Sequence, residues 1–120
     1  MFSGKRILLV EDEALIAILL EDIVAGLGAT VIGTESQLDL AISRAETEVL
    51  DGAILDVNLG GKRSYAVADA LRRRGVPYAF ATGYGELGVD AAHRDAPVLM
   101  KPYSEEEVAR ALGRLLATGP

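Results

Sequence analysis

Residues 7–13 read Ile-Leu-Leu-Val-Glu-Asp-Glu, so four apolar residues pass directly into three consecutive acids. A short apolar run of this kind is typical of a strand buried on both faces of a parallel sheet. Four further apolar or β-branched runs follow at 30–34, 53–57, 78–81 and 98–100. We therefore expect five strands, the first of which ends where the acids begin.

Helical patterns stand between these strands. Leu15, Ile18, Leu19 and Ile23 repeat at helical spacing, and a second helix is expected over residues 37–46. Such an alternation of strands and helices predicts an α/β fold. With right-handed crossovers, five units of this kind favour a flavodoxin-like (βα)5 doubly wound sandwich, in which a parallel five-stranded sheet has the strand order 2-1-3-4-5.

The remaining helices differ in how clearly they are marked. The third ends in three arginines before Gly75, where cations complement the helix dipole. The last helix begins at Ser104, which forms a capping box with Glu107. Between residues 83 and 97, three glycines interrupt a weak apolar pattern, so the fourth helix is expected to be short or mobile.

The composition limits the function classes. The chain has 120 residues, half of them hydrophobic, which predicts one domain over residues 1–120 with no output domain attached. Eighteen acidic against 12 basic residues give a formal net charge of −6, which disfavours direct binding of nucleic acid. There is no cysteine, and no apolar run is long enough for a signal peptide or a membrane span. These features indicate a cytoplasmic protein, in which the single histidine, His93, is interpreted as a surface-loop residue.

The residues at the strand ends carry the chemistry. Ligands of doubly wound sheets bind beyond the carboxyl ends of the strands, where the winding direction reverses. Acids 11–13 follow the first strand and Asp56 lies at the end of the third, while Thr82 and Lys101 follow the fourth and fifth. Each of these features alone also has an ordinary structural interpretation. Acids 11–13 could simply be the acidic start of a helix, and Asp56 a turn residue. Thr82 could be a strand terminus, and Lys101 a solvated charge. Their common position at the ends of four strands favours a single site.

A cluster of carboxylates requires a cation. Anions in one place repel one another and destabilise the fold unless they are neutralised. All the available ligands are oxygens, which favours Mg²⁺, with Mn²⁺ or Ca²⁺ as possible substitutes. We expect Asp12, Asp56 and a backbone carbonyl near Asn58 to hold the metal, and Glu11 to bind it directly or through water. A phosphoryl group on Asp56 would then meet a metal, a hydroxyl and an ammonium.

Taken together, these residues resemble the receiver domains of response regulators in two-component signalling, and the resemblance covers essentially the whole chain. It rests on Glu11-Asp12-Glu13, Asp56, Thr82 and Lys101-Pro102. Residues 77–85, Pro-Tyr-Ala-Phe-Ala-Thr-Gly-Tyr-Gly, further resemble the FAT GUY receivers, which are known mainly from alphaproteobacteria and are associated with general stress signalling.

The resemblance implies that Asp56 accepts a phosphoryl group from the phosphohistidine of a sensor histidine kinase of the HWE/HisKA2 type. Thr82, Gly83 and Lys101 would contact the phosphoryl group, and the bond from Lys101 to the following proline would be cis. Glu11 would hold the metal through water. The protein would not be an enzyme that acts on a separate substrate. It would be a phosphoacceptor that catalyses its own phosphorylation and dephosphorylation. As a monomer, it would either signal to an unidentified downstream protein or drain phosphoryl groups from a shared kinase.

One position departs from the receiver pattern. Val98 stands three positions before the lysine, where most receivers carry an aromatic switch residue, and FAT GUY receivers share this departure. We expect phosphorylation to order residues 83–95, with Tyr84 taking part of the role of the missing aromatic residue.

Two other function classes fit the sequence less well. A small Mg²⁺-dependent aspartyl-phosphate phosphohydrolase of the haloacid-dehalogenase type would use a similar residue set, but it typically has a second aspartate where this chain has Asn58. A flavodoxin-like electron carrier is disfavoured, because the first strand leads into acids where a flavin phosphate needs an anion-binding loop.

Overall fold

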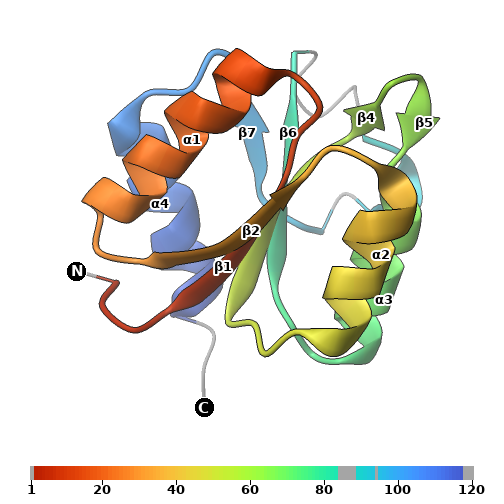
Figure 1. Ribbon diagram of the computed structural model, residues 1–120, viewed down its shortest axis with the longest axis horizontal. Coiled ribbons are helices and arrows are strands. Elements are labelled where there is room, and N and C mark those ends of the chain that lie inside the picture. Colours follow the sequence, from red (N-terminus) through yellow and green to blue (C-terminus); the bar gives the residue numbers. More distant parts are fainter. Residues whose placement is uncertain (1, 84–88, 94, 118–120) are drawn as a thin grey trace.

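The computed structural model describes residues 2–83, 89–93 and 95–117. Its centre is a parallel five-stranded sheet in the order β2-β1-β3-β6-β7 (Figure 1). The strands are β1 (Arg6–Val10), β2 (Thr30–Glu35), β3 (Gly52–Asp56), β6 (Tyr78–Thr82) and β7 (Val98–Met100). This order confirms the predicted 2-1-3-4-5 arrangement, with β6 and β7 as the fourth and fifth strands.

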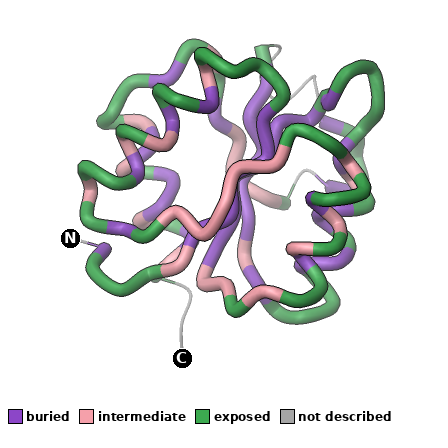
Figure 2. The backbone as a smooth tube through the Cα atoms, viewed as in Figure 1, coloured by how far each residue is buried: buried purple, intermediate pink, exposed green. Residues whose placement is uncertain are grey.

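Helices cover both faces of the sheet. One face carries α1 (Ala14–Gly26) and α4 (Glu105–Leu116), and the other carries α2 (Leu38–Thr47) and α3 (Tyr65–Arg73) (Figure 1). The core accordingly consists of two clusters, one on each face. Every residue of β3 and β6 is buried, and Figure 2 shows buried backbone through the centre of the sandwich. None of the described helices is both long and apolar enough to cross a membrane.

The apolar stripe that indicated α1 lies largely in solvent. Leu15 is 83% exposed and Ile18 is 54% exposed, whereas Ala17, Leu20 and Val24 are buried. Because α1 is apolar around most of its circumference, the spacing predicted a helix without identifying the face that packs.

A two-stranded hairpin that no sequence pattern indicates follows β3. β4 (Asn58–Leu59) pairs antiparallel with β5 (Lys62–Arg63), and Gly60 and Gly61 form the turn between them. Both glycines have positive φ, +57° and +89°. Side chains other than glycine rarely adopt this region, so the two glycines permit the tight turn. The hairpin lies directly after Asp56 and is therefore part of the surroundings of the site.

The segment expected to hold a short fourth helix is described at residues 89–93 and 95–97. There it contains one 3-10 turn, η2 (Ala91–His93). Residues 84–88 and 94 lie outside the described residues, and with them Tyr84 and the predicted ordering of this segment.

The prediction that His93 is a surface-loop residue is wrong. Its side chain is buried, with Nδ1 2.5 Å from Asp90 Oδ1 and Nε2 2.9 Å from Asp69 Oδ1. The ring stacks on Tyr65 with a centroid distance of 4.5 Å and an interplanar angle of 13°. Two carboxylates and an aromatic ring satisfy the imidazole, and two of these partners come from α3, far from His93 in the sequence.

Candidate functional site

The carboxyl ends of β1 and β3 bring three acids together. β1 and β3 are neighbours, so Glu11, which follows β1, comes close to Asp56 at the end of β3. Glu11, Asp12 and Asp56 each offer a carboxylate oxygen, and these oxygens all lie within 4.8 Å of one another. Glu11 and Asp56 are buried, whereas Asp12 is exposed. The inner part of the cluster is therefore buried, and its outer part is open to solvent.

Lys101 supplies the cation of this cluster. Its Nζ lies 2.9 Å from Asp56 Oδ2 and 3.0 Å from Glu11 Oε1. Burial lowers the pKa of the Lys101 ammonium, but the hydrogen bonds to Asp56 and Glu11 outweigh that effect and the pKa is raised. The peptide bond from Lys101 to Pro102 is cis, as expected. Lys101 is thus charged and directed at the acids.

Glu11 resists ionisation because it is buried. Burial, followed by the hydrogen bond shared with Asp56, raises the pKa of Glu11 to about 7, although the Glu13 backbone N–H and Lys101 oppose the shift. The Tyr103 hydroxyl lies 3.4 Å from Glu11 Oε1. Burial, and then the charge of Glu11, raises the pKa of Tyr103, so its hydroxyl stays protonated. Tyr103 was not among the predicted site residues.

The β4–β5 hairpin is fastened to the acids through its backbone. The Asn58 N–H donates to Asp56 Oδ1 at 3.1 Å, and the Gly60 N–H donates to Asp12 Oδ2 at 2.8 Å. The Asn58 side chain accepts from the Gly61 N–H at 2.9 Å, so it stabilises the turn. Two of the three acids are therefore oriented by the segment that immediately follows β3.

An open cleft of about 560 Å³ lies above these groups. It brings together six of the predicted site residues and three residues that were not predicted as ligands or contacts. They are Asp12, Asp56, Asn58, Thr82, Gly83 and Lys101, together with Glu13, Val57 and Arg63. Glu11 lies among the acids as the buried partner of Lys101. Of the two predicted switch residues, Tyr84 is outside the described residues, and Val98 is half-buried on β7, beside Phe80, where it packs against the core on the α2–α3 face.

The donor set fits a hard divalent cation. Three carboxylates converge within bonding reach of one ion, and a single ammonium serves the two buried ones. Oxygen ligands open to solvent on one side are the arrangement that Mg²⁺ prefers, since it retains several of its waters. A buried and otherwise undercompensated cluster of acids is also stabilised by such an ion.

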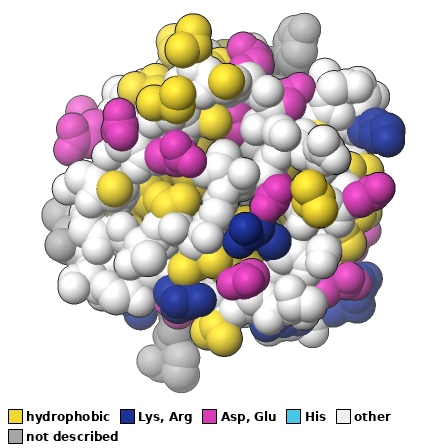
Figure 3. Space-filling view, in the orientation of Figure 1, with side chains coloured by type: hydrophobic (Ala, Val, Ile, Leu, Met, Phe, Trp, Pro, Cys, Tyr) yellow, Lys and Arg dark blue, Asp and Glu magenta, His cyan; other side chains and the backbone are white. Residues whose placement is uncertain are grey.

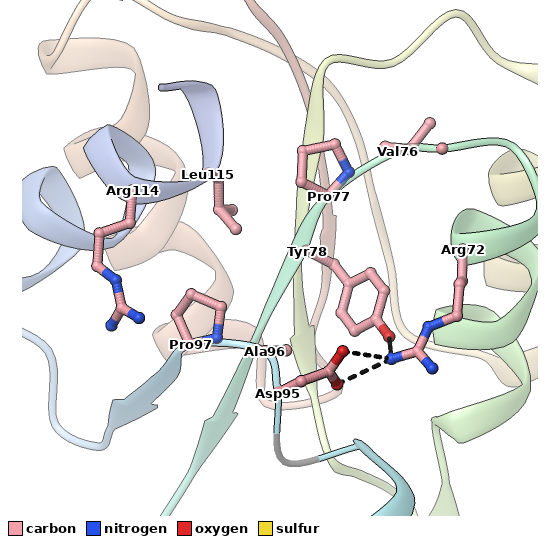
Figure 4. A pocket seen from close by; sticks show the side chains of 10 residues that line it. Arg72, Val76, Pro77, Tyr78, Asp95, Ala96, Pro97, Arg114 and Leu115 are labelled. Carbon is pink, nitrogen blue, oxygen red and sulfur yellow. Dashed lines mark hydrogen bonds and ion pairs between the residues drawn. The ribbon is translucent and has the colours of Figure 1, made fainter. Parts of the chain in front are cut away.

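A second hollow of about 530 Å³ lies at the opposite edge of the sheet, between α3 and α4 (Figure 4). Its lining includes Arg72, whose Nη2 donates to Asp95 Oδ1 at 2.8 Å and to the Tyr78 hydroxyl at 3.0 Å. It contains none of the converging acids. The converging carboxylates and the Lys101 ammonium therefore belong to the Asp56 cleft and not to this hollow.

The chain is similar to several solved structures and to one curated protein. It is 48% identical to SdrG from Sphingomonas melonis Fr1, with a TM-score of 0.85, and the match covers 97% of this chain and 99% of that one. The PhyR response regulator REC domain of Erythrobacter litoralis is 29% identical, with a TM-score of 0.83 over 98% of this chain and 95% of that one. The receiver domain of the sensor histidine kinase PA1611 from Pseudomonas aeruginosa, solved with magnesium in its active-site cleft, shares the fold at 24% identity and a TM-score of 0.80, over 97% of this chain and 100% of that one.

The curated relative is the phyllosphere-induced regulator PhyR of Methylorubrum extorquens, which is 35% identical over 117 residues. That match covers 94% of this chain but 44% of the relative, so the chain spans less than half of its length. No protein-family model matches the chain.

Proposed function

The chain belongs to the receiver domains of response regulators, which act in two-component signalling, and we propose that Asp56 is the residue on which it accepts a phosphoryl group from a histidine kinase. The observation that carries this proposal is the position of the Asp56 carboxylate. It lies beside the Lys101 ammonium and two further acids, in an open cleft that Thr82 also lines. A nucleophile, a metal site and two groups suited to phosphoryl oxygens are thus adjacent.

In the proposed reaction, a carboxylate oxygen of Asp56 attacks the phosphorus of a phosphohistidine. The O–P bond forms while the P–N bond breaks, and the electron pair of that bond remains on the imidazole nitrogen of the kinase. The Asn58 N–H orients the Asp56 carboxylate by its hydrogen bond to Oδ1. Lys101 transfers its contact from the carboxylate to a phosphoryl oxygen, and the Thr82 hydroxyl donates to another.

We further propose that Asp12, Asp56 and the Asn58 carbonyl hold Mg²⁺, with Glu11 acting through water. The bound ion would supply Lewis-acid stabilisation of the charge that develops on the phosphoryl oxygens. Burial raises the pKa of Glu11 most, and the neighbouring Asp56 adds to the rise, so a divalent cation beside these acids would favour the ionised form of Glu11. Mn²⁺ and Ca²⁺, which take the same oxygen ligands, are the expected substitutes.

The exposed apolar face of α1 is the docking surface that we propose for the kinase. Leu15, Ile18 and Leu19 are 83%, 54% and 43% exposed, and Figure 3 shows hydrophobic side chains gathered over α1. Leu15 lies three residues after Asp12 in the sequence, so a partner bound to this face would reach the cleft. Exposed apolar patches of this kind mark protein interaction sites. The 77–85 stretch further supports an HWE/HisKA2 kinase and general stress signalling as the context.

The test is a heteronuclear NMR titration with Mg²⁺ and then beryllofluoride, a mimic of the aspartyl phosphate, on the wild type and Asp56→Asn. We expect saturable shifts around Asp56, Thr82, Gly83 and Lys101 in the wild type and their loss in the variant. Folded protein that shows no shifts with ample Mg²⁺ would contradict the proposal. Steady turnover of a chromogenic phosphate ester that Asp56→Asn abolishes would instead identify a phosphohydrolase.

A further inference from the structure

The two faces of the β4–β5 hairpin carry different cations. In the antiparallel pairing, Asn58 lies opposite Arg63 and Leu59 lies opposite Lys62. Opposite residues share a face and neighbours along a strand alternate, so Arg63 faces the same way as Asn58, and Lys62 the other way. The two hollows beside the hairpin agree with this assignment. Asn58 and Arg63 line the Asp56 cleft, whereas Leu59 and Lys62 line a separate hollow at the start of α2.

The position of Arg63 is tied to the site itself. The hairpin is held by the hydrogen bond from the Gly60 N–H to Asp12, and by the one from the Ser64 N–H to the Val57 carbonyl oxygen at 2.9 Å. Leu59 is 4% exposed and anchors the opposite face in the core. An exposed arginine on a segment anchored in this way stays at the mouth of the cleft at a low cost in ordering entropy.

The acids that line the cleft would repel an anionic donor, and a free cation at the mouth of the cleft would offset that repulsion. Asp12, Glu13 and Asp56 line the cleft, and its ammonium, Lys101, is already engaged by Asp56 and Glu11. Every phosphoryl donor is an anion and must pass these acids to reach Asp56. Within the described part of the chain, Arg63 forms no ion pair with an acid, so its guanidinium is available for an incoming anion.

We propose that Arg63 is a donor-binding residue, whose guanidinium pairs with the anionic oxygens of the phosphoryl donor as it enters the Asp56 cleft. This inference rests on the proposed phosphoacceptor function. The planar guanidinium offers two parallel N–H groups that match phosphoryl oxygens. A cation at the rim of a site acts mainly on the encounter with a charged partner, and its effect weakens with salt.

The test measures phosphorylation by phosphoramidate, a small anionic donor, in Mg²⁺ buffer by intact-mass spectrometry. The proteins are the wild type, Arg63→Ala, Arg63→Lys and the matched control Lys62→Ala, which removes the cation from the other face of the same hairpin. At low ionic strength we expect Arg63→Ala to lower the second-order rate constant of phosphorylation about fivefold, because KM for phosphoramidate rises. Lys62→Ala should change the same rate constant less than about twofold. Arg63→Lys should restore part of the loss, and added salt should narrow the gap between wild type and Arg63→Ala.

Two further measurements separate the possible failures. Mg²⁺ affinity, followed by NMR, should be no weaker in Arg63→Ala than in the wild type, because a distorted hairpin would weaken the metal site, whereas loss of a nearby cation would not. Equal rate constants for Arg63→Ala and Lys62→Ala would overturn the inference while leaving the phosphoacceptor function standing. If Asp56→Asn is phosphorylated by phosphoramidate as well as the wild type is, both the role of Arg63 and the phosphoacceptor function of Asp56 are overturned.

Discussion

The Lys101 ammonium lies 2.9 Å from Asp56 Oδ2 and 3.0 Å from Glu11 Oε1, so one cation serves two buried carboxylates. Lys101 therefore stabilises the metal-free fold as well as the proposed phosphoryl group. Removing one partner of a buried ion pair leaves its charges uncompensated, which typically costs about 3–5 kcal/mol.

Lys101→Ala should lower the free energy of unfolding in metal-free buffer by about 2 kcal/mol. The loss is smaller than for a fully buried pair because Glu11 can take up a proton. Urea denaturation in EDTA measures it. The control is Arg110→Ala, which removes an exposed ion pair with Glu106 at 3.3 Å and should cost less than about 0.5 kcal/mol. Equal losses in the two variants would contradict this account of Lys101.

Mg²⁺ should stabilise the wild type and fail to stabilise Asp12→Asn. A ligand that binds the folded state alone adds about 1.4 kcal/mol at ten times its Kd. Urea denaturation at increasing Mg²⁺ concentration gives this increment. Glu13→Gln is the matched control, because Glu13 lines the cleft without belonging to the three converging carboxylates. If Asp12→Asn gains as much stability as the wild type, Asp12 is not a ligand.

The parts of this structure that depend on periodicity and topology are predictable from the sequence. Five apolar runs became the five strands of the sheet, and the order of a doubly wound fold placed Glu11 beside Asp56. Ser104 is confirmed as the N-cap of α4, since its hydroxyl accepts from the Glu107 N–H at 3.1 Å. The Glu107 carboxylate, the predicted partner in the capping box, accepts from the same hydroxyl at 2.9 Å. Each of these signals lies within one segment or follows from the connection rules.

The features that were missed depend on contacts between distant segments. Strands of two residues are too short to show a period, so the hairpin was not predicted and Arg63 was not placed in the cleft. The burial of His93 depends on Asp69, 24 residues away. The position of Tyr103 after the fifth strand placed it beside the site, but its contact with Glu11, 92 residues away, depends on β1 and the end of β7 meeting at the same edge of the sheet.

Ser104→Ala should destabilise the protein without affecting the site. Loss of an N-cap that accepts a backbone N–H costs about 1 kcal/mol. Urea denaturation measures the loss. Beryllofluoride affinity should stay at the wild-type value, because Ser104 caps α4 and does not line the Asp56 cleft. Ser43→Ala, on the exposed side of α2, is the control and should change stability by less than about 0.5 kcal/mol. An unchanged stability in Ser104→Ala would show that solvent replaces the cap.

His93 should hold its proton to a higher pH in the folded protein than in the unfolded chain. Burial lowers the pKa of His93, but the hydrogen bonds to Asp69 and Asp90 outweigh it, so the pKa is raised above its ordinary value of 6.5. Tyr65 stacks on the ring, and its hydroxyl accepts from the Asp90 N–H at 2.8 Å. Because this is the single histidine of the chain, the NMR titration of its ring proton in untagged protein gives the pKa without assignment.

The raised pKa has a definite consequence for stability. Protonated His93 stabilises the folded state fully below pH 6.5, and this contribution is lost as the pH rises through the folded-state pKa. The difference in unfolding free energy between the wild type and His93→Gln should therefore shrink from pH 6 to pH 9, and the same comparison cancels the titration of Glu11. Asp69→Asn, which removes one partner, should lower the His93 pKa relative to the wild type. A folded-state pKa at or below 6.5 would show that burial, not the two carboxylates, dominates the environment of the ring.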